Sequence, residues 1–226
     1  MSIELEVFSD DRDAARRGAE LLAAAGRQAV EERGIHALAM SGGSSPAVWG
    51  MLATLDGLEE MPWGETELFQ VDERIASPGS RERNLTHFVL GLSIGHQAAL
   101  RPMPVTQRDL EAAAREYESQ LPERLDMVHL GLGPDGHTAS LVPGDPVLEA
   151  TDRRVALTET AYQGHRRMTL TYPELAAARQ IVWLVTGEKK RDALAKLLSG
   201  DRSIPAGRVE NDSMIVIADR AAAESY

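Results

Sequence analysis

A chain of 226 residues is long enough to bury the core of one large α/β domain or of two small ones. Its 43% of hydrophobic and 26% of charged residues are the shares of an ordinary folded protein and exclude a disordered chain. The formal net charge of -11 argues against a nucleic-acid-binding or anionic-membrane surface, and an anionic ligand needs a few local cations to overcome it.

The chain contains no cysteine, which excludes disulfides, a thiolate nucleophile and thiolate metal ligands. No stretch approaches about eighteen consecutive apolar residues, and the first residues lack a basic segment followed by an apolar one. We therefore expect a cytoplasmic protein without a membrane or nucleic-acid partner. Because the sequence shows no heptad pattern and no long apolar patch, we also expect a monomer.

Segments with strand patterns alternate with segments with helix patterns along the whole chain. Short β-rich runs predict strands at residues 3–8, 36–40, 66–71, 126–130, 167–171, 181–186 and 213–217. Runs rich in Ala, Leu and charged residues predict helices at residues 12–33, in a stretch after Pro46, and at 85–90, 107–121 and 188–198. Asp10 and its neighbours offer N-cap side chains to the first helix, and Gly34 ends it.

This order of elements predicts an α/β fold in which helices flank a mostly parallel sheet. The sequence contains no internal repeat, low-complexity tract or linker, so we expect a single domain over residues 1–226. In open α/β sheets the loops after the carboxyl ends of the strands bind the ligands. Polar loops that follow predicted strands are therefore the places to search for chemistry.

The first such loop has the sequence SGGSSP and joins a strand to a helix. Its hydroxyl groups and backbone amides, from Ser41, Gly42, Gly43, Ser44 and Ser45, can converge on an anion at the helix N-terminus. The alternative is an ordinary tight turn capped by Ser44 or Ser45, because the spacing fits neither a Walker loop nor a dinucleotide-binding motif. On this loop alone the two interpretations are equal.

The second polar loop contains Asp72, Glu73 and Arg74 directly after a predicted strand. Such a triplet is more often a solvated charged turn whose members pair with one another. Its position at the end of an inner strand raises the odds of a functional role only somewhat.

The third loop has the sequence GLGPDGHTASLVPG and contains Asp135 and His137 between glycines and prolines. Histidine exchanges a proton near neutral pH, and a carboxylate close by in the chain can orient its ring or raise its basicity. A structural loop whose His only binds a carbonyl group is an equal alternative, and a metal pair is disfavoured because no third ligand accompanies it. The histidines at 36, 87, 96 and 129 are expected to be structural or surface groups.

Basic residues form two clusters, at 165–167 before a predicted strand and at 189–191 at the start of a helix. Most such charges are solvated surface groups. An acidic chain that binds an anion nevertheless needs a few cations that point inward, and an arginine can bind a phosphate with two hydrogen bonds.

Taken together and in this order, these motifs resemble the 6-phosphogluconolactonase family. The resemblance covers residues from about 3 to 223 and rests on SGGSSP, VDER at 71–74, RMT at 167–169, GEKK at 187–190 and IPA at 204–206. Its most specific part is GPDGHTASL at 133–141, followed by Pro143 and Gly144. The related glucosamine-6-phosphate deaminases share a G-x-D-G-H core but usually continue with IAFNE, where this chain has TASL.

The sequence departs from the family pattern in two places. The family often has two or three prolines before its Arg-Ile-Thr, where this chain has Gln163, Gly164, His165 and Arg166. The family pattern therefore does not predict the shape of this loop. The family also often has a Trp near the last strand, where this chain has the segment DSMIV. The second departure concerns packing, and neither touches the proposed acid/base group.

The resemblance implies a Rossmann-like three-layer α/β/α sandwich. It also implies hydrolysis of 6-phospho-D-glucono-1,5-lactone to 6-phosphogluconate, the second step of the oxidative pentose phosphate pathway, without metal or organic cofactor. His137 is assigned as the base that activates water and then as the acid for the leaving oxygen, with Asp135 orienting it. Arg74 is assigned to stabilise developing negative charge or to help close the site, and Asp72 and Glu73 to fix Arg74 or bind sugar hydroxyls. The phosphate is assigned to Ser41, Gly42, Gly43, Ser44, Ser45, Arg167 and Lys190.

Two other functions remain as alternatives. One is a glucosamine-6-phosphate deaminase or isomerase, for which Asp72 would be the base that transfers the proton. The other is a non-catalytic sugar-phosphate-sensing domain of a transcription regulator. The net charge of -11 and the lack of a helix-turn-helix segment before the first predicted strand disfavour this second alternative.

Overall fold

The helices and strands follow the predicted alternation along most of the chain. The computed structural model describes residues 3–43 and 45–224. The strands are β1 (Ile3–Phe8), β2 (His36–Met40), β3 (Thr66–Gln70), β4 (Asp72–Arg74), β5 (Leu100–Arg101), β6 (Met127–Gly131), β7 (Val155–Leu157), β8 (Arg167–Leu170), β9 (Ile181–Val185) and β10 (Met214–Asp219). The α-helices are α1 (Asp11–Arg33), α2 (Pro46–Gly57), α3 (Asn84–Gly91), α4 (Leu110–Gln120), α5 (Tyr172–Ala177), α6 (Arg191–Leu198) and α7 (Arg220–Ala223).

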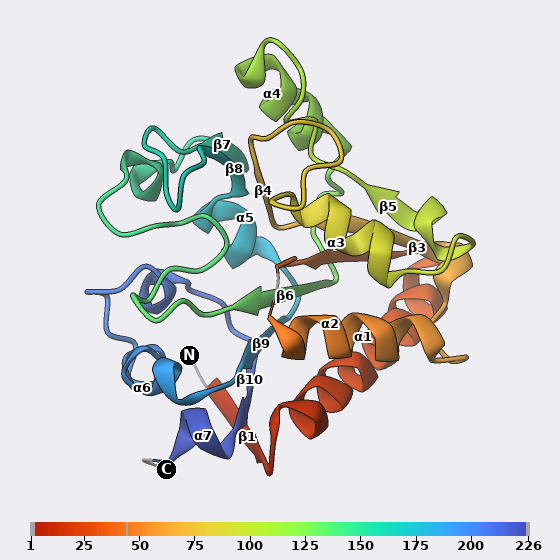
Figure 1. Cartoon of the computed structure of the whole chain (residues 1–226). Coiled ribbons are helices and arrows are strands. Elements are labelled where there is room, and N and C mark those ends of the chain that lie inside the picture. The colour runs from red at the N-terminus through yellow and green to blue at the C-terminus, as the bar shows by residue number, and fades with distance from the viewer. Residues whose placement is uncertain (1–2, 44, 225–226) are drawn as a thin grey trace.

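A seven-stranded sheet with the strand order β1-β10-β9-β6-β2-β3-β5 lies at the centre of the molecule (Figure 1). Each pair of neighbouring strands in it is parallel, as predicted. Residues of β9 show how the sheet is packed, because Ile181 and Trp183 lie in one apolar core and Val182 lies in the other. A strand with both faces covered is apolar at successive positions, and this accounts for the unbroken apolar run that predicted it.

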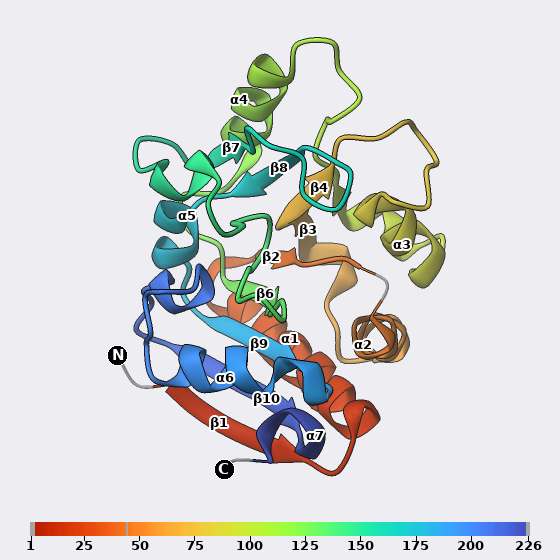
Figure 2. The same ribbon diagram turned by 60° about the vertical axis from the view of Figure 1, so that its left-hand side comes forward.

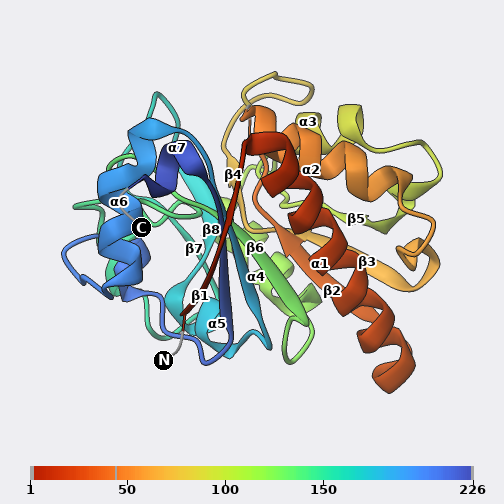
Figure 3. The same ribbon diagram turned by 90° about the horizontal axis from the view of Figure 1, so that it is seen from below.

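Helices cover both faces of this sheet (Figure 3). α1, α2 and α3 pack against one face, and α4 to α7 pack against the other together with a small antiparallel sheet of order β4-β8-β7. The three-layer α/β/α sandwich expected from the resemblance is therefore confirmed. Within residues 3–43 and 45–224, no helix combines the length and the apolar composition needed to cross a membrane.

The ends of α1 illustrate how local sequence sets an element. Asp10 is the N-cap residue, and its carboxylate accepts hydrogen bonds from the backbone N–H groups of Arg12 and Asp13. At the other end Gly34 adopts a left-handed conformation with φ 77°, and its N–H donates to the carbonyl oxygen of Val30 at 2.8 Å. Both boundaries agree with the prediction.

The segment Asp72–Arg74 is a strand and not the charged turn that its composition suggests. β4 pairs with β8, so that Asp72 lies opposite Thr169 and Arg74 opposite Arg167. This pairing joins parts of the chain that are distant in sequence, and a local pattern of charges contains no sign of it. The prediction also missed β5, β7 and α5, and it began α4 at Gln107, whereas Asp109 caps a helix that starts at Leu110.

The central pair of strands, β2 and β6, marks the point where the chain changes sides. β2 leads into α2 on one face, whereas the chain after β6 passes to β7, β8 and α5 on the opposite face (Figure 2). The two connections diverge from the carboxyl ends of adjacent strands, and α/β sheets form their ligand-binding crevices at such a switch point.

Candidate active site

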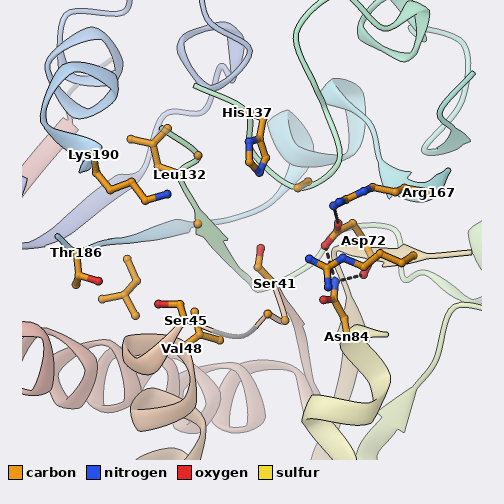
Figure 4. Close-up of a pocket in the computed structure, with 17 residues that line it drawn as sticks. Ser41, Ser45, Val48, Asp72, Asn84, Leu132, His137, Arg167, Thr186 and Lys190 are labelled. Carbon is orange, nitrogen blue, oxygen red and sulfur yellow. Dashed lines mark hydrogen bonds and ion pairs between the residues drawn. The ribbon is translucent and has the colours of Figure 1, made fainter. Parts of the chain in front are cut away.

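A cavity with a volume of about 250 Å³ opens at this switch point (Figure 4). Its walls come from the segments that follow β2, β3, β6 and β9, as well as from the start of β8, from α2 and from the start of α3. Most of the residues that the sequence assigned to chemistry line it, namely Ser41, Gly42, Gly43, Ser45, Asp72, Arg74, His137, Arg167 and Lys190. Ser44, assigned to the same site, lies outside the described residues.

His137 and Asp135 form a bound pair at the wall of the cavity. His137 Nδ1 lies 2.6 Å from Asp135 Oδ1, and the backbone N–H of His137 donates to the same oxygen at 3.2 Å. The hydrogen bond from His137 and the opposite charge that it gains on protonation hold the pKa of Asp135 well below its usual range. An ionised carboxylate keeps the proton of a neutral imidazole on Nδ1, which leaves the lone pair on Nε2.

Nε2 is the nitrogen of His137 that is available for proton transfer. Within residues 3–43 and 45–224 it has no hydrogen-bond partner, and Figure 4 shows the imidazole pointing into the cavity. Asp135 does not line the cavity and acts on it through the imidazole. The arrangement suits a base that takes a proton from water.

Two glycines give the loop of His137 its shape. The N–H of Gly133 donates to the carbonyl oxygen of His137 at 2.8 Å, and a Cβ at Gly133 would lie only 2.0 Å from His137 Nδ1 and 2.6 Å from Asp135 Oδ1. Gly136 has φ 81°, a conformation that favours glycine, and a Cβ there would lie 2.4 Å from Ile204 Cβ. The acid/base pair therefore packs directly against the backbone of its own loop.

Arg74, Arg167 and Asp72 form one end of the cavity. Asp72 is buried and accepts hydrogen bonds from Asn84 Nδ2 at 3.0 Å and from Ser140 Oγ at 2.5 Å. Arg167 Nη1 lies 3.8 Å from the carboxylate of Asp72, and burial lowers the pKa of Arg167. The two guanidinium groups and one carboxylate give this end a positive charge that is partly neutralised.

Lys190 occupies the opposite end, beside Thr186 and Ser45, as Figure 4 shows. It belongs to a short 3-10 helix (Glu188–Lys190) that precedes α6. Burial lowers the pKa of Lys190, and the charge of Asp135 opposes this shift. Arg167 and Lys190, both assigned to one phosphate, therefore lie at different ends of the cavity.

The glycine-serine loop places Ser45 at the N-cap of α2. Within residues 45–224 the side chain of Ser45 makes no capping hydrogen bond, and Pro46 occupies the first turn of the helix. This excludes Ser45 as the side-chain cap of the ordinary turn considered above and leaves its hydroxyl group to the cavity. At Gly42 a Cβ would lie 2.6 Å from Asn84 Cβ, so this loop and the start of α3 approach as closely as glycine allows.

Glu73, assigned from the sequence either to fix Arg74 or to bind sugar hydroxyls, lies outside the cavity. It is fully buried, and its carboxylate accepts hydrogen bonds from the backbone N–H groups of Arg74, Asn84 and Leu85 and from Gln70 Nε2. Arg83 also lies near it, with Nε 3.4 Å from Oε2. Glu73 thus holds the start of α3 against β4, and this positions Asn84 and Arg74.

Some cavity residues had no signal in the sequence. Val48, Asn84, Leu184 and Thr186 also line it, and none of them belongs to a motif that the sequence analysis singled out as chemistry. Thr186 is the last residue of the strand predicted at 181–186, which is the only indication the sequence offered for it. Among the described residues, no three His, Asp or Glu side chains gather in a way that could hold a metal ion.

Comparison with known proteins identifies the class to which this fold and site belong. Residues 9–217 match the family model described as glucosamine-6-phosphate isomerases/6-phosphogluconolactonase, and the chain belongs to this family. A 6-phosphogluconolactonase of Mycobacterium tuberculosis is 33% identical, and the alignment covers 99% of this chain and 98% of that protein.

Solved structures agree on the fold. A 6-phosphogluconolactonase from Shewanella baltica superposes with a TM-score of 0.86 at 24% identity, covering 96% of this chain and 98% of that one. A monomeric glucosamine-6-phosphate deaminase superposes with a TM-score of 0.82 at 19% identity, covering 99% of this chain and 100% of that one. The fold alone therefore does not separate the two activities of the family.

Proposed function

We propose that this protein hydrolyses 6-phospho-D-glucono-1,5-lactone to 6-phospho-D-gluconate, the second step of the oxidative pentose phosphate pathway. The similarity to curated 6-phosphogluconolactonases over nearly the whole chain supports this substrate. The continuation of the G-x-D-G-H core as TASL supports it over the deaminase. The observation that carries the proposal is the His137–Asp135 pair, which is bound at 2.6 Å and lies beside a cavity that is also lined by the cationic side chains of arginine and lysine residues.

The chemistry follows from this geometry. His137 Nε2 takes a proton from water, and the resulting hydroxide adds to C1 of the lactone. The tetrahedral intermediate then loses its bond between C1 and the ring oxygen, and protonated His137 gives its proton to that oxygen. Asp135 keeps the imidazole oriented and stabilises its protonated form during the reaction.

The two ends of the cavity suit the two ends of the substrate. At the end with Lys190, the hydroxyl groups of Ser45 and Thr186 and the N-terminus of α2 offer hydrogen-bond donors, and none of the described residues lines the cavity there with a carboxylate, so we place the phosphate at this end. At the other end Asp72 would repel a phosphate dianion. Arg74 and Arg167 there face C1, where they stabilise the oxyanion, and Asp72 accepts hydrogen bonds from sugar hydroxyls.

A direct assay tests the proposal. Purified protein is mixed with freshly generated lactone, and 6-phosphogluconate is measured through 6-phosphogluconate dehydrogenase, with spontaneous hydrolysis subtracted. The proposal requires a rate that rises with enzyme concentration. Ammonia release from glucosamine 6-phosphate would indicate the deaminase, and binding of sugar phosphates without turnover of either substrate would indicate a sensing domain.

We further propose that the protein is a cytoplasmic monomer organised as one domain. The substrate is an anionic sugar phosphate, which does not cross membranes unaided and is therefore consumed where it is made. Light scattering during gel filtration tests the oligomeric state, and a dimer would contradict it. Leu90 and Ile94, which are 69% and 88% exposed, are the apolar residues that a second copy would be expected to cover.

A further inference from the structure

The loop in which this chain lacks the prolines of its family forms a tight hairpin. Tyr162 and His165 make an antiparallel bridge, and the N–H of Tyr162 donates to the carbonyl oxygen of His165 at 2.9 Å. Between them Gln163 and Gly164 have φ values of 51° and 86°, and positive φ at both central residues is the mark of a type I′ hairpin turn. The hairpin brings the side chain of Tyr162 to the loop of His137.

Tyr162 contacts both members of the acid/base pair. Its hydroxyl group donates to Asp135 Oδ2 at 2.8 Å, and the hydroxyl oxygen of Tyr162 lies 3.2 Å from His137 Nδ1. The rings of Tyr162 and His137 meet edge to face with their centroids 5.1 Å apart. Burial and the hydrogen bond to Asp135 raise the pKa of Tyr162 to about 12, so the hydroxyl group remains a donor at neutral pH.

We propose that Tyr162 is a positioning residue of the reaction, whose hydroxyl group fixes the carboxylate of Asp135 so that His137 Nε2 faces the cavity. The proposal rests on the lactonase function proposed above. The side chain of Asp135 is 37% exposed, so without a protein donor on Oδ2 water competes for that oxygen and the carboxylate can rotate away from the imidazole. Tyr162 itself does not line the cavity, which is why we assign its effect to Asp135.

Arg167 ties this hairpin to the cavity wall. Its guanidinium carbon lies 5.1 Å from the centroid of the Tyr162 ring, and Nη2 donates to the carbonyl oxygen of Tyr162 at 3.1 Å. These contacts use the ring and the backbone of Tyr162. A Tyr162→Phe variant therefore keeps the stacking with Arg167 and loses only the hydroxyl group.

The first experiment compares Tyr162→Phe with the wild type. A hydrogen bond to a charged group is lost, so we expect kcat to fall about tenfold while KM changes less than about twofold. Tyr172→Phe is the matched control, because the Tyr172 ring also lies under an arginine, 5.0 Å from Arg208, and its hydroxyl group donates to Pro205 at 2.9 Å. The control should keep the wild-type kcat, and a Tyr162→Phe variant with wild-type kcat would overturn the proposal.

A double-mutant cycle tests whether Tyr162 acts through Asp135. In an Asp135→Asn background the added Tyr162→Phe change should lower kcat by less than about twofold, since the group that Tyr162 positions is already altered. Effects that multiply would instead show that Tyr162 acts independently of Asp135, and the proposal would fail.

A measurement without substrate separates this proposal from the proposed function. The nitrogen chemical shifts of the His137 imidazole report which ring nitrogen carries the proton. We expect an Nδ1–H imidazole in the wild type and a larger share of the Nε2–H form in Tyr162→Phe. If the wild type fails to hydrolyse the lactone, the proposed lactonase function is wrong, but the chemical shifts still test the role of Tyr162. Identical shifts in the wild type and in Tyr162→Phe would refute the positioning role.

Discussion

His129 and His137 belong to one strand and the loop that follows it, yet the structure gives them opposite surroundings. His129 lies in β6, fully buried, and neither ring nitrogen has a hydrogen-bond partner among the described residues. Burial lowers the pKa of His129 to about 4, so it is neutral at physiological pH. His137 borders a cavity and is bound to an ionised carboxylate at 2.6 Å. The comparison shows that placement, and not residue type, makes one of them a candidate for proton transfer.

Replacing His137 by Ala tests the histidine assigned to proton transfer and should have the largest effect on turnover. We expect kcat to fall about a hundredfold to ten-thousandfold, the range that a lost acid/base group usually costs. Because the side chain borders a cavity and supports no core, the thermal unfolding midpoint should stay close to that of the wild type. The control is His96→Ala, because His96 is bound to Asp56 outside the cavity. This variant should keep the activity of the wild type. Near-wild-type turnover in His137→Ala would remove the base assignment.

Gly133→Ala should disturb the same pair without removing it. The added Cβ would lie 2.0 Å from His137 Nδ1 and 2.3 Å from Cε1, so the imidazole must move while the backbone of the loop can remain. A displacement of this size can cost about a hundredfold in kcat. Gly57→Ala introduces a Cβ that has no heavy atom of the described residues within 4 Å and serves as the control. Unchanged kinetics in Gly133→Ala would mean that turnover does not depend on where His137 lies.

Lys190→Ala extends the contrast from proton transfer to binding. If Lys190 holds the phosphate, the loss of its charge should raise KM about tenfold and alter kcat less. Lys189→Ala is a close control, because Lys189 belongs to the same short helix, is exposed and does not line the cavity. Equal KM values in the two variants would move the phosphate to the end with Arg74 and Arg167.

The part of the site that could be predicted from the sequence lies in the segments that directly follow predicted strands. Ser41, Asp72 and His137 each come after an apolar run, and the carboxyl ends of parallel strands meet at one edge of the sheet. Once the alternation of strands and helices was recognised, their convergence followed from topology. The three-layer fold was predictable for the same reason.

What the sequence did not show depends on contacts between distant segments. Glu73 looks like a member of a charged turn, and only the backbone N–H groups of Asn84 and Leu85 make it an internal anchor. Tyr162 reaches Asp135 only because Gln163 adopts a positive φ, which its residue type does not suggest. No periodicity marks such residues, since each owes its place to a partner that folding supplies.

The buried member of the pair, His129, can be tested by measuring the stability of the protein. His129→Leu removes two polar atoms that have no hydrogen-bond partner in the described part of the chain, so the free energy of unfolding near neutral pH should rise by about 1 kcal/mol. Native His129 has a pKa of about 4, below the 6.5 of an unperturbed histidine, so the unfolded chain binds the proton first. Proton binding by His129 therefore leaves the free energy of unfolding unchanged above pH 6.5 and lowers it progressively as the pH falls from 6.5 toward 4.

The variant should consequently lose less stability than the wild type between neutral and mildly acidic pH. In that window, a histidine whose pKa is lowered by folding decreases the free energy of unfolding by at most about 1.4 kcal/mol for each unit that the pH falls. His36, whose pKa burial also lowers to about 4, remains in the variant, so the acid slope should decrease and not vanish. Urea unfolding at neutral and acidic pH measures both slopes. Equal slopes would show that His129 is already protonated in the native state, and the contrast with His137 would then rest on cavity access alone.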